Sequence, residues 1–261
     1  MQAKKSLGQH FLKNPRVADR VADAAHVSKE DTTLEIGPGK GMLTEVLLKQ
    51  AGKVVAVEKD PELIPVLQNT FSTELSDGQL VLIPGDILDP AIQEKVFQNL
   101  HLPYKIAANI PYFITGKLIR LFFSFPQKPE SIGLLVQNEV ALRAVGKGGK
   151  ESILSMSIKA YGTPRYVGKV SAGNFSPPPK VDSAILGIEN ISEEFFDGFT
   201  EEEFFEVVKA GFAHKRKRLQ KNLEDLLPQY LFSFDHLSPN IRAEDMSLED
   251  WKTLLSGKRR T

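Results

Sequence analysis

Short runs of apolar, β-branched residues alternate with longer segments of helical periodicity from Asp31 to about Asn190. A short continuous apolar run predicts a buried strand, and apolar residues at every third or fourth position predict a helix. Strands separated by helix-length segments are joined by right-handed crossovers, so the pattern predicts a largely parallel sheet. The predicted strands are residues 32–36, 53–58, 79–84, 104–109 and 131–137, followed by a final antiparallel pair at 164–170 and 183–189.

Strand signals stop past Ser192, and the remaining sequence has helical periodicity. Trp251 and Phe205 are the expected core anchors of this part. We therefore predict one domain at residues 1–192 and a small all-α domain at residues 193–261. The helices predicted in the second domain are residues 201–213, 216–227 and 247–255.

The composition permits a hydrophobic core and excludes several kinds of site. Of the 261 residues, 41% are hydrophobic, and the chain has no cysteine, which excludes disulfides, thiolate zinc sites and cysteine nucleophiles. No uncharged apolar stretch reaches the length of about eighteen residues that a membrane span needs. No apolar segment follows the first residues, so we expect no signal peptide and a cytoplasmic location. We also expect no metal, and nothing in the sequence requires more than a monomer.

The formal net charge is zero, but nucleic-acid binding responds to local clusters of charge rather than to the total. Basic clusters lie near both ends of the chain. They permit RNA binding, although a cluster taken alone is more often a solvated face. The basic residues are Lys4, Lys5, Lys13, Arg16 and Arg20 in an N-terminal extension at residues 1–28, then Lys209, Lys215, Arg216, Lys217, Arg218 and Lys221, and finally Lys258, Arg259 and Arg260.

A glycine-rich turn joins the first predicted strand to the helix that follows it. Its sequence, Glu35 to Gly41, spaces three glycines as G-x-G-x-G. Glycines here let the backbone adopt positive φ and approach a ligand closely, and this first turn of an open α/β sheet is where nucleotides bind. The spacing differs from the dinucleotide pattern G-x-G-x-x-G. In addition, Pro38 lacks an N–H group that a pyrophosphate would use.

Two acids follow at the ends of the next two strands. Glu58 closes the second strand, where a carboxylate can bind both hydroxyls of a ribose. Asp86 follows the third strand, where it can accept a hydrogen bond from the amine of adenine. S-adenosylmethionine contains ribose and adenine but no phosphate, so it fits this set. NAD is the alternative ligand, and a purely structural turn is the alternative role for the glycines.

Asn109-Ile110-Pro111-Tyr112 follows the fourth strand and is therefore expected at the same edge of the sheet as the glycine turn. An adenine amine is a weak nucleophile because its lone pair is delocalised into the ring. The side-chain oxygen of Asn109 and the carbonyl of Ile110 can accept its two hydrogens and free the lone pair for methyl transfer. Tyr112 offers a face on which the target base can stack, worth on the order of 1–3 kcal/mol. Taken alone, the four residues could also be an ordinary Asn-x-Pro turn before a helix, stiffened by the proline.

Over nearly its whole length the chain resembles the KsgA-type small-subunit ribosomal RNA adenine dimethyltransferases. Several of the matching motifs are weak singly, but their order along the chain is highly specific. The motifs are Leu7 to Leu12, Glu35 to Gly41, Glu58, Asp86, Asn109 to Tyr112, Gln137 to Ala141, Phe175 to Ser183 and Arg242 to Asp245.

The resemblance implies a Rossmann-like class I methyltransferase fold, in which helices cover both faces of a mostly parallel seven-stranded sheet. It also implies a small C-terminal helical domain that binds rRNA or the ribosomal subunit. The implied activity is N6,N6-dimethylation of two adjacent adenines in the 3′-terminal hairpin loop of 16S rRNA within the pre-30S subunit. The implied cofactor is S-adenosyl-L-methionine.

The resemblance further implies roles for single residues. Phe175 is expected as a second aromatic wall beside the target base, and the alternative is a core residue that braces the proline loop. The run from Lys215 to Arg218, with Lys221, is expected to contact phosphates. His10 stands where some relatives have asparagine, and its role rests on the resemblance alone. The expected cofactor contacts are His10, Leu12, Gly37, Gly39, Glu58, Lys59, Asp86, Ile87 and Asn109, and the expected catalytic residues are Asn109, Ile110, Pro111, Tyr112 and Phe175.

Three segments depart from the family pattern. Asn138 replaces a lysine, residues 146–152 lack a tyrosine-glycine pattern, and residues 170–174 lack the usual prolines. These departures bear on how the substrate is positioned and leave the chemical residues intact.

Two alternative functions share much of this sequence pattern. An erythromycin-resistance type methyltransferase would also carry Asn-Ile-Pro-Tyr but modifies 23S rRNA, and the segments from Phe175 to Ser183 and from Arg242 to Asp245 favour the small-subunit enzyme. A non-catalytic RNA-binding or transcription factor of the same fold would not need to keep Glu58, Asp86 and Asn109. A DNA adenine methyltransferase is disfavoured because no separate base-reading domain is evident.

Overall fold

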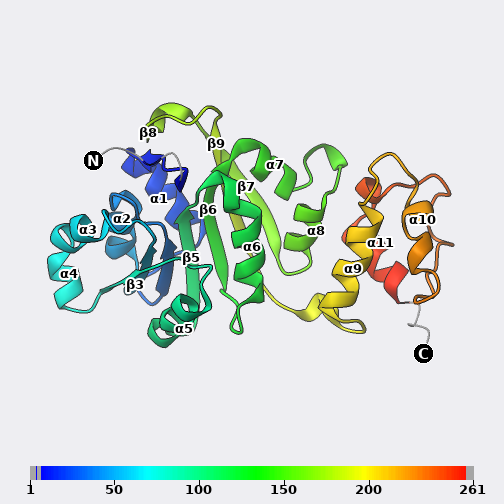
Figure 1. The fold of residues 1–261 in the computed structure, drawn as a ribbon, viewed down its shortest axis with the longest axis horizontal. Helices are drawn as coiled ribbons and strands as arrows, with labels where there is room; N and C mark the ends of the chain where they lie inside the picture. Colours follow the sequence, from blue (N-terminus) through cyan, green and yellow to red (C-terminus); the bar gives the residue numbers. More distant parts are fainter. Residues whose placement is uncertain (1–3, 5–6, 257–261) are drawn as a thin grey trace. The chain divides into compact units, whose positions relative to one another are not determined.

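The structure is a computed structural model that describes residue 4 and residues 7–256 (Figure 1). It divides into two compact units. Unit 1 comprises residues 1–141 and 165–191, and unit 2 comprises residues 142–164 and 192–261. The division differs from the expected one in that residues 142–164 belong with the C-terminal helices. Lys5 and the basic tail residues Lys258, Arg259 and Arg260 lie outside the described residues.

Unit 1 is built on a seven-stranded sheet with the strand order β4-β3-β2-β5-β6-β9-β7, and β1 and β8 form a separate two-stranded ladder. β2 to β6 run parallel, and β9 runs antiparallel to β6. This is the predicted class I methyltransferase sheet. The strands are β1 (Phe11–Leu12), β2 (Thr32–Ile36), β3 (Lys53–Glu58), β4 (Leu80–Pro84), β5 (Tyr104–Asn109), β6 (Ser131–Gln137), β7 (Thr163–Val170), β8 (Phe175–Ser176) and β9 (Ser183–Glu189).

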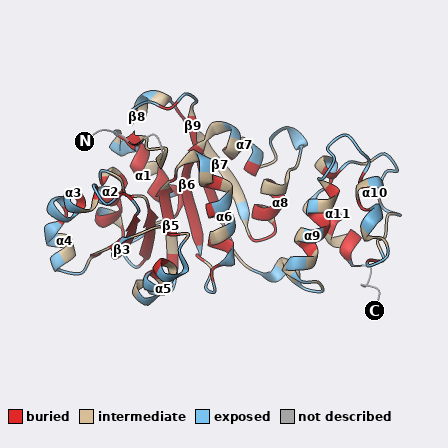
Figure 2. Cartoon of the chain, in the orientation of Figure 1, coloured by how far each residue is buried: buried red, intermediate tan, exposed pale blue. Residues whose placement is uncertain are grey.

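The central strands are buried on both faces because helices cover both sides of the sheet (Figure 2). Continuous apolar runs such as Val54 to Val57 suit this position, whereas an alternating pattern would suit a sheet with one solvated face. α1 packs against α2, β6 and β9, and α6 lies on the other side of the sheet in Figure 1. The helices of unit 1 are α1 (Pro15–Ala24), α2 (Met42–Gln50), α3 (Ile64–Thr70), α4 (Ser72–Ser76), α5 (Pro90–Asn99), the 3₁₀ turn η2 (Tyr112–Ile114) and α6 (Thr115–Ser124), while α7 (Asn138–Ala144) spans the boundary.

The helix α1 was not predicted, because residues 1–28 were interpreted only as a basic extension. Asn14 caps it by accepting a hydrogen bond from the Arg16 N–H, and Pro15 occupies its first turn. Val17 and Val21 are buried at a spacing of four residues. The Asn-Pro start followed by this spacing is the signal that could have identified the helix.

Unit 2 is helical, with an aromatic and aliphatic core. Trp251 is fully buried, as predicted. Phe204 is the fully buried phenylalanine, whereas the expected anchor Phe205 is only partly buried and stacks on Tyr161. The helices and 3₁₀ turns of this unit are η3 (Lys147–Gly149), α8 (Ile153–Lys159), η5 (Glu194–Phe196), α9 (Glu201–Gly211), α10 (Leu219–Asn222), η6 (Glu224–Leu226), η7 (Ala243–Asp245) and α11 (Leu248–Leu255).

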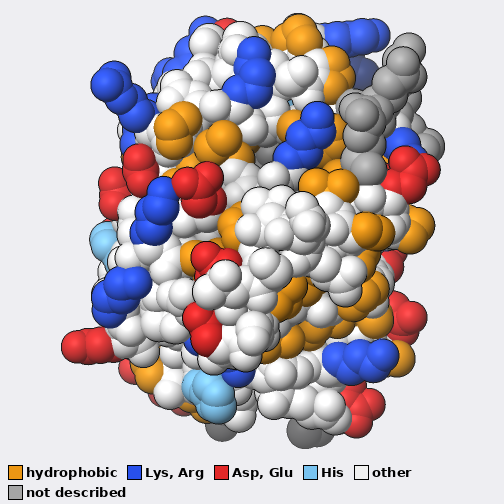
Figure 3. All heavy atoms as spheres, turned by 90° about the vertical axis from the view of Figure 1, so that its left-hand side faces the viewer, with side chains coloured by type: hydrophobic (Ala, Val, Ile, Leu, Met, Phe, Trp, Pro, Cys, Tyr) orange, Lys and Arg blue, Asp and Glu red, His pale blue; other side chains and the backbone are white. Residues whose placement is uncertain are grey.

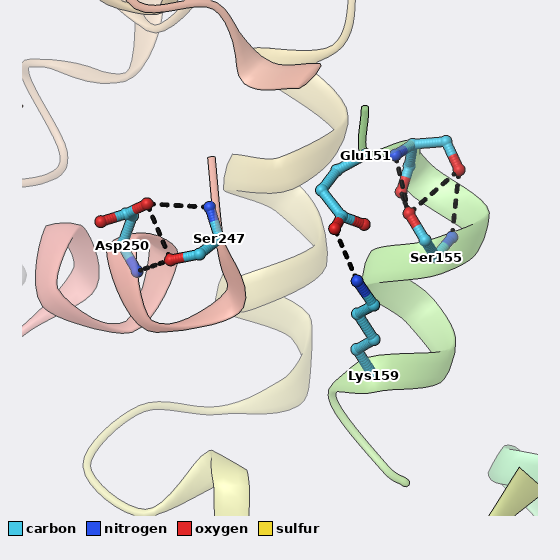
Figure 4. A network of polar contacts seen from close by, with 6 residues as sticks. Glu151, Ser155, Lys159, Ser247 and Asp250 are labelled. Carbon is cyan, nitrogen blue, oxygen red and sulfur yellow. Dashed lines mark hydrogen bonds and ion pairs between the residues drawn. The ribbon is translucent and has the colours of Figure 1, made fainter. Parts of the chain in front are cut away.

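Reciprocal caps fix where the unit 2 helices begin. Ser247 and Asp250 exchange hydrogen bonds at the start of α11, and Ser152 and Ser155 do so at the start of α8 (Figure 4). Glu151, the residue before this second cap, forms an ion pair with Lys159 at the end of α8. Each capping pair satisfies N–H groups that the first turn of a helix leaves unpaired. These caps explain why α11 begins one residue later than predicted.

The predicted helix at residues 216–227 is wrong in its first part. The chain from His214 to Arg218 forms an exposed turn, and the helical segment α10 begins only at Leu219. Four consecutive cations in one helical turn would repel one another, which disfavours a helix there. Leu219 is fully buried, and its N–H donates to the carbonyl of Ile241, which fixes the helix start at that residue.

No helix among the described residues is long and apolar enough to cross a membrane.

Gly133 in β6 allows α1 to approach the sheet. An added Cβ would lie 2.3 Å from the carbonyl oxygen of Val21 and 2.8 Å from the backbone nitrogen of Ala25. These are backbone atoms, which cannot rotate away. We expect Gly133→Ala to lower the free energy of unfolding by about 3 kcal/mol, as overpacking does elsewhere, measured by urea denaturation. Gly173→Ala is the matched control, because its Cβ would meet nothing within 4 Å, and an equal loss in both variants would contradict the packing argument.

Candidate active site

One pocket lies at the carboxyl edge of the parallel strands of unit 1. It contains about 1140 Å³ of empty space, counting its open mouth. Because β2 to β5 are parallel and in register, the loops that follow them meet at this edge, as expected for an open α/β sheet. The predicted residues that line the pocket are His10, Leu12, Gly37, Gly39, Glu58, Lys59, Asp86, Ile87, Asn109, Ile110, Pro111 and Tyr112.

The glycine turn after β2 forms one wall of the pocket. Gly37 has φ +72°, a conformation that an L side chain rarely adopts, and an added Cβ would meet nothing within 4 Å. The space beside Gly37 is therefore available for close approach of a ligand to the backbone. Gly41 also has a positive φ, +88°, but the space beside it is filled, since an added Cβ would lie 2.6 Å from the ring of Phe71.

Glu58, at the end of β3, faces the glycine turn. One carboxylate oxygen accepts the N–H of Gly39 at 3.0 Å, and the other accepts the N–H of Asp60 at 2.7 Å. Burial raises the pKa of Glu58 above its ordinary value, although these backbone N–H groups oppose the rise. Each oxygen keeps a second lone pair, so the fixed carboxylate can still accept hydrogen bonds from a ligand.

Asp86, just after β4, is held by a cation and a backbone N–H. Its side chain accepts from Lys59 Nζ at 2.8 Å and from the N–H of Leu88 at 3.0 Å. Burial alone would raise the pKa of Asp86, but these hydrogen bonds outweigh it and keep the pKa below its ordinary value. The carboxylate is therefore ionised at neutral pH and can accept a hydrogen bond.

Asn109, at the end of β5, is oriented by the N-terminal segment. Its Nδ2 donates to the carbonyl oxygen of His10 at 3.1 Å. Because a carbonyl can only accept, the amide nitrogen must face His10, and the side-chain oxygen points elsewhere. This oxygen accepts no hydrogen bond from the residues that the structure describes, so it is available to a donor in the pocket.

His10 packs against Tyr112. The two rings are stacked with centroids 5.7 Å apart, and His10 Nδ1 lies 2.8 Å from the carbonyl oxygen of Pro177. The Tyr112 hydroxyl lies 2.5 Å from that of Ser183, which anchors the far end of the ring. The segment before β1 therefore joins the Asn109 to Tyr112 turn to the proline loop.

Phe175 is not a wall of the pocket. Its side chain is only 1% exposed, and it belongs to the core cluster that includes Phe11 and Leu12. The reason is that β8 pairs with β1, with Phe175 opposite Leu12, so its ring is covered. The second aromatic ring beside Tyr112 is that of His10, and Phe175 is the core residue that braces the N-terminal segment.

Glu35 is a pocket residue that the sequence analysis quoted within the glycine motif but did not assign to the site. It is 1% exposed; one carboxylate oxygen accepts from the Thr44 hydroxyl at 2.7 Å, and Oε1 has no hydrogen-bond partner among the described residues. Burial raises the pKa of Glu35 to about 8, and the nearby Glu58 adds to the rise. An acid directly before a glycine turn at a strand end was the signal for it.

The basic residues occupy separate places. Lys215, Arg216, Lys217 and Arg218 lie together on the exposed turn of unit 2 and make no ion pair with any described residue, whereas Lys221 is paired with Glu224. On unit 1, basic and acidic side chains are interspersed on the face that carries α3 and α4, and basic ones predominate along its upper edge (Figure 3). Because its four cations have no ion-pair partner among the described residues, the turn in unit 2 is an unneutralised cluster of cations.

Asn138, one of the positions expected to depart from the family pattern, forms a neutral contact. Its side-chain oxygen accepts a hydrogen bond from the Tyr166 hydroxyl at 2.7 Å.

Comparison with known proteins agrees with this geometry. The family model described as ribosomal RNA adenine dimethylase matches residues 1–257. The chain belongs to this family. The ribosomal RNA small subunit methyltransferase A of Dehalococcoides mccartyi is 42% identical over 260 residues, which cover 97% of this chain and 88% of the relative.

Solved structures agree with the fold. A dimethyladenosine transferase from Plasmodium falciparum is similar with a TM-score of 0.76 and 27% identity, covering 94% of this chain and 96% of the other. The 23S rRNA methyltransferase ErmE is similar with a TM-score of 0.74 and 25% identity, covering 94% and 98%. The fold therefore does not separate a dimethyladenosine transferase from a 23S rRNA methyltransferase, whereas the sequence relative named above is a small-subunit enzyme.

The pocket fits S-adenosyl-L-methionine, the cofactor of this family. The unpartnered Oε1 of Glu35 can accept a hydrogen bond from a cationic amino group once the carboxyl has lost its proton, and the open space at Gly37 admits a ligand against the backbone. Glu58 and Asp86 add fixed acceptors suited to ribose hydroxyls and to an adenine amine. No cluster of backbone N–H groups for a pyrophosphate is needed, which agrees with Pro38 in the turn.

The raised pKa of Glu35 predicts how stability depends on pH. With a folded pKa of about 8 and an ordinary value of 4.5, the folded state holds a proton that the unfolded state has lost, so stability falls as pH rises between these values. We expect the free energy of unfolding of Glu35→Gln to rise relative to that of the wild type from pH 5 to pH 8, by up to about 1.4 kcal/mol per pH unit. Urea denaturation of both proteins across this range tests it. A constant difference between them would show that Glu35 is ionised in the fold.

Proposed function

We propose that the chain is a small-subunit rRNA adenine dimethyltransferase. It transfers methyl groups from S-adenosyl-L-methionine to the exocyclic amine of two adjacent adenines in the 3′-terminal hairpin loop of 16S rRNA. The observation that carries the proposal is the orientation of Asn109, whose amide nitrogen is bound to the His10 carbonyl while its oxygen is left as an acceptor in the pocket. Family membership and 42% identity to a small-subunit enzyme support the choice of polymer.

The reaction needs a bound cofactor, held by Glu35, Glu58 and Asp86, which supplies an electrophilic methyl group on a sulfonium. The chain's own residues act on the amine. The Asn109 oxygen and the Ile110 carbonyl accept its two hydrogens, which localises the lone pair on nitrogen. The new N–C bond would form as the methyl–sulfur bond of the sulfonium breaks, with a neutral thioether as the leaving group. The nitrogen is then cationic and strongly acidic, and its proton passes to water.

No residue of the pocket has to act as a strong base in this scheme. Positioning can lower a barrier by roughly 7–11 kcal/mol in favourable cases, so the fixed turn from Asn109 to Tyr112 can supply most of the acceleration. Tyr112 is stacked against the His10 ring on one face and bound to the Ser183 hydroxyl at its far end, and it offers a preset surface to the incoming base. The base would have to displace or adjoin the His10 ring to reach it.

An erythromycin-resistance type activity on 23S rRNA is the second candidate. The observation that favours it is the fold, which matches that of ErmE with a TM-score of 0.74.

Unit 2, with its unneutralised turn from Lys215 to Arg218, serves in the proposal as the rRNA-binding and ribosome-binding part. A cytoplasmic, monomeric enzyme that acts on the pre-30S particle completes the proposal.

Asn109→Ala tests the role of the amide. It removes the acceptor for the amine, so we expect the rate of methyl transfer from radiolabelled cofactor to unmodified 30S particles to fall by about 100-fold or more. Cofactor affinity, measured by calorimetry, should change little because Glu35, Glu58 and Asp86 remain.

Two comparisons make the Asn109 test decisive. Asn138→Ala is the matched control, since Asn138 is an asparagine of the same unit that does not line the pocket. Unchanged turnover of Asn109→Ala would remove Asn109 from the mechanism, and faster wild-type transfer to 50S than to 30S particles would favour the second candidate.

The exposed turn of unit 2 predicts a salt effect. We expect glutamine at Lys215, Arg216, Lys217 and Arg218 together to weaken particle binding and to reduce the slope of log K against log salt by roughly 0.7–0.9 for each lost phosphate contact. Binding is measured by filter retention at several salt concentrations. Lys49→Gln with Lys95→Gln is the control, because it removes exposed charge elsewhere. An equal slope in the cluster variant and the wild type would show that the turn is a solvated surface that does not contact phosphates.

A further inference from the structure

Phe113 is an exposed aromatic side chain at the mouth of the active-site pocket. It is 68% exposed, more than any other large apolar side chain among the described residues, and it is the only aromatic one of that exposed set. The others are Val66, Leu102, Val181 and Leu231. A phenyl ring left in water forgoes the stabilisation that burial would give, and at the mouth of this pocket its exposed face is open to a ligand.

The backbone that carries the ring is held by hydrogen bonds. It lies in the 3₁₀ turn η2, where the N–H of Ile114 donates to the Pro111 carbonyl at 3.2 Å and the Thr115 hydroxyl donates to the Tyr112 carbonyl at 3.2 Å. One side of the ring is backed by Gly8, which has φ +63° and whose added Cβ would lie 2.9 Å from the Phe113 ring. A ring held in this way loses little conformational entropy when something stacks on it.

An exposed cation and open space accompany the ring. Lys117 follows four residues later, which places it on the same side of the helical segment. It makes no ion pair with any described residue, although its charge helps to lower the pKa of Asp86. An added Cβ at Gly116, between them, would meet nothing within 4 Å. An aromatic face one helical turn from an unpaired cation matches the two parts of a nucleotide, its base and its phosphate.

We infer that Phe113 and Lys117 form a second nucleotide subsite, in which the Phe113 ring stacks on the base next to the target adenine and Lys117 contacts its phosphate. The inference rests on the proposed function, because it presumes that RNA presents the target base to the neighbouring Tyr112. Adjacent positions on one rigid turn then hold adjacent nucleotides. The subsite would favour substrates in which the flanking base is free to stack outside a helix.

The test combines a protein change with an RNA change. Small-subunit particles are assembled with 16S rRNA whose 3′ segment is a ligated synthetic oligonucleotide, carrying either the normal flanking base or an abasic ribose on one side of the target. Single-turnover methyl transfer is measured for the wild type and Phe113→Ala. We expect Phe113→Ala to lower kcat/KM about tenfold on the normal particle. On the particle that lacks the base on which Phe113 stacks, the loss should be less than twofold, because there is no base left to stack.

Further variants separate stacking from other roles of the ring. Phe113→Tyr should transfer methyl groups as fast as the wild type because it keeps the aromatic face, whereas Phe113→Leu should be as slow as Phe113→Ala. Leu102→Ala is the control, since Leu102 is 56% exposed but does not line the pocket, and it should match the wild type. Cofactor affinity measured by calorimetry should stay within twofold for all these variants.

Each failure has a distinct meaning. An equal loss for Phe113→Ala on normal particles and on both abasic particles would overturn the subsite, as would a parallel loss of cofactor affinity, which would make the ring a cover for the cofactor. Wild-type protein that transfers no methyl group to any small-subunit particle would overturn the proposed function and this inference with it. If the wild type transfers methyl groups but Phe113→Ala loses the same factor on every particle, the inference alone would be overturned.

Discussion

The parallel register of β2, β3, β4 and β5 is the constraint on which the site depends. Because the strands run in the same direction and are in register, their carboxyl ends meet at one edge. Glu35, Glu58, Asp86 and Asn109 are spread over 75 positions of the chain, yet each stands at or just after such an end and all line one pocket. Their shared burial also raises the pKa of Glu35 and of Glu58.

The N-terminal segment completes what the sheet begins. Its backbone carbonyl at His10 orients the Asn109 amide, its His10 ring covers part of Tyr112, and Lys40 lies 4.9 Å from the centroid of the Phe11 ring. The ladder between β1 and β8 ties the same segment to the proline loop. The orientation of the Asn109 side-chain oxygen is thus set by contacts between parts of the chain about a hundred residues apart, so motion of this segment would alter the pocket at Asn109 and at Tyr112.

The sequence allowed the sheet and most of the pocket to be predicted, because continuous apolar runs and strand-end polar residues are local signals. Thr32–Ile36 and Tyr104–Asn109 are strands with the predicted bounds. Phe175 could not be placed in this way, since its burial depends on pairing with Leu12 far away in sequence. The start of α10 at Leu219 likewise depends on a hydrogen bond to Ile241. Phe113 was missed because exposure of an aromatic residue is visible only in three dimensions.

The central claim is that this pocket methylates adjacent adenines of the small-subunit rRNA, and nucleotide-resolution mapping of the product tests it most directly. Unmodified 30S particles and 50S subunits would be incubated with the protein and S-adenosyl-L-methionine, and the rRNA fragments analysed by mass spectrometry. The account predicts N6,N6-dimethyladenosine at two adjacent positions in the 3′-terminal hairpin loop of 16S rRNA and none in 23S rRNA. Dimethyladenosine confined to 23S rRNA, or methylation at another atom of the base, would contradict it.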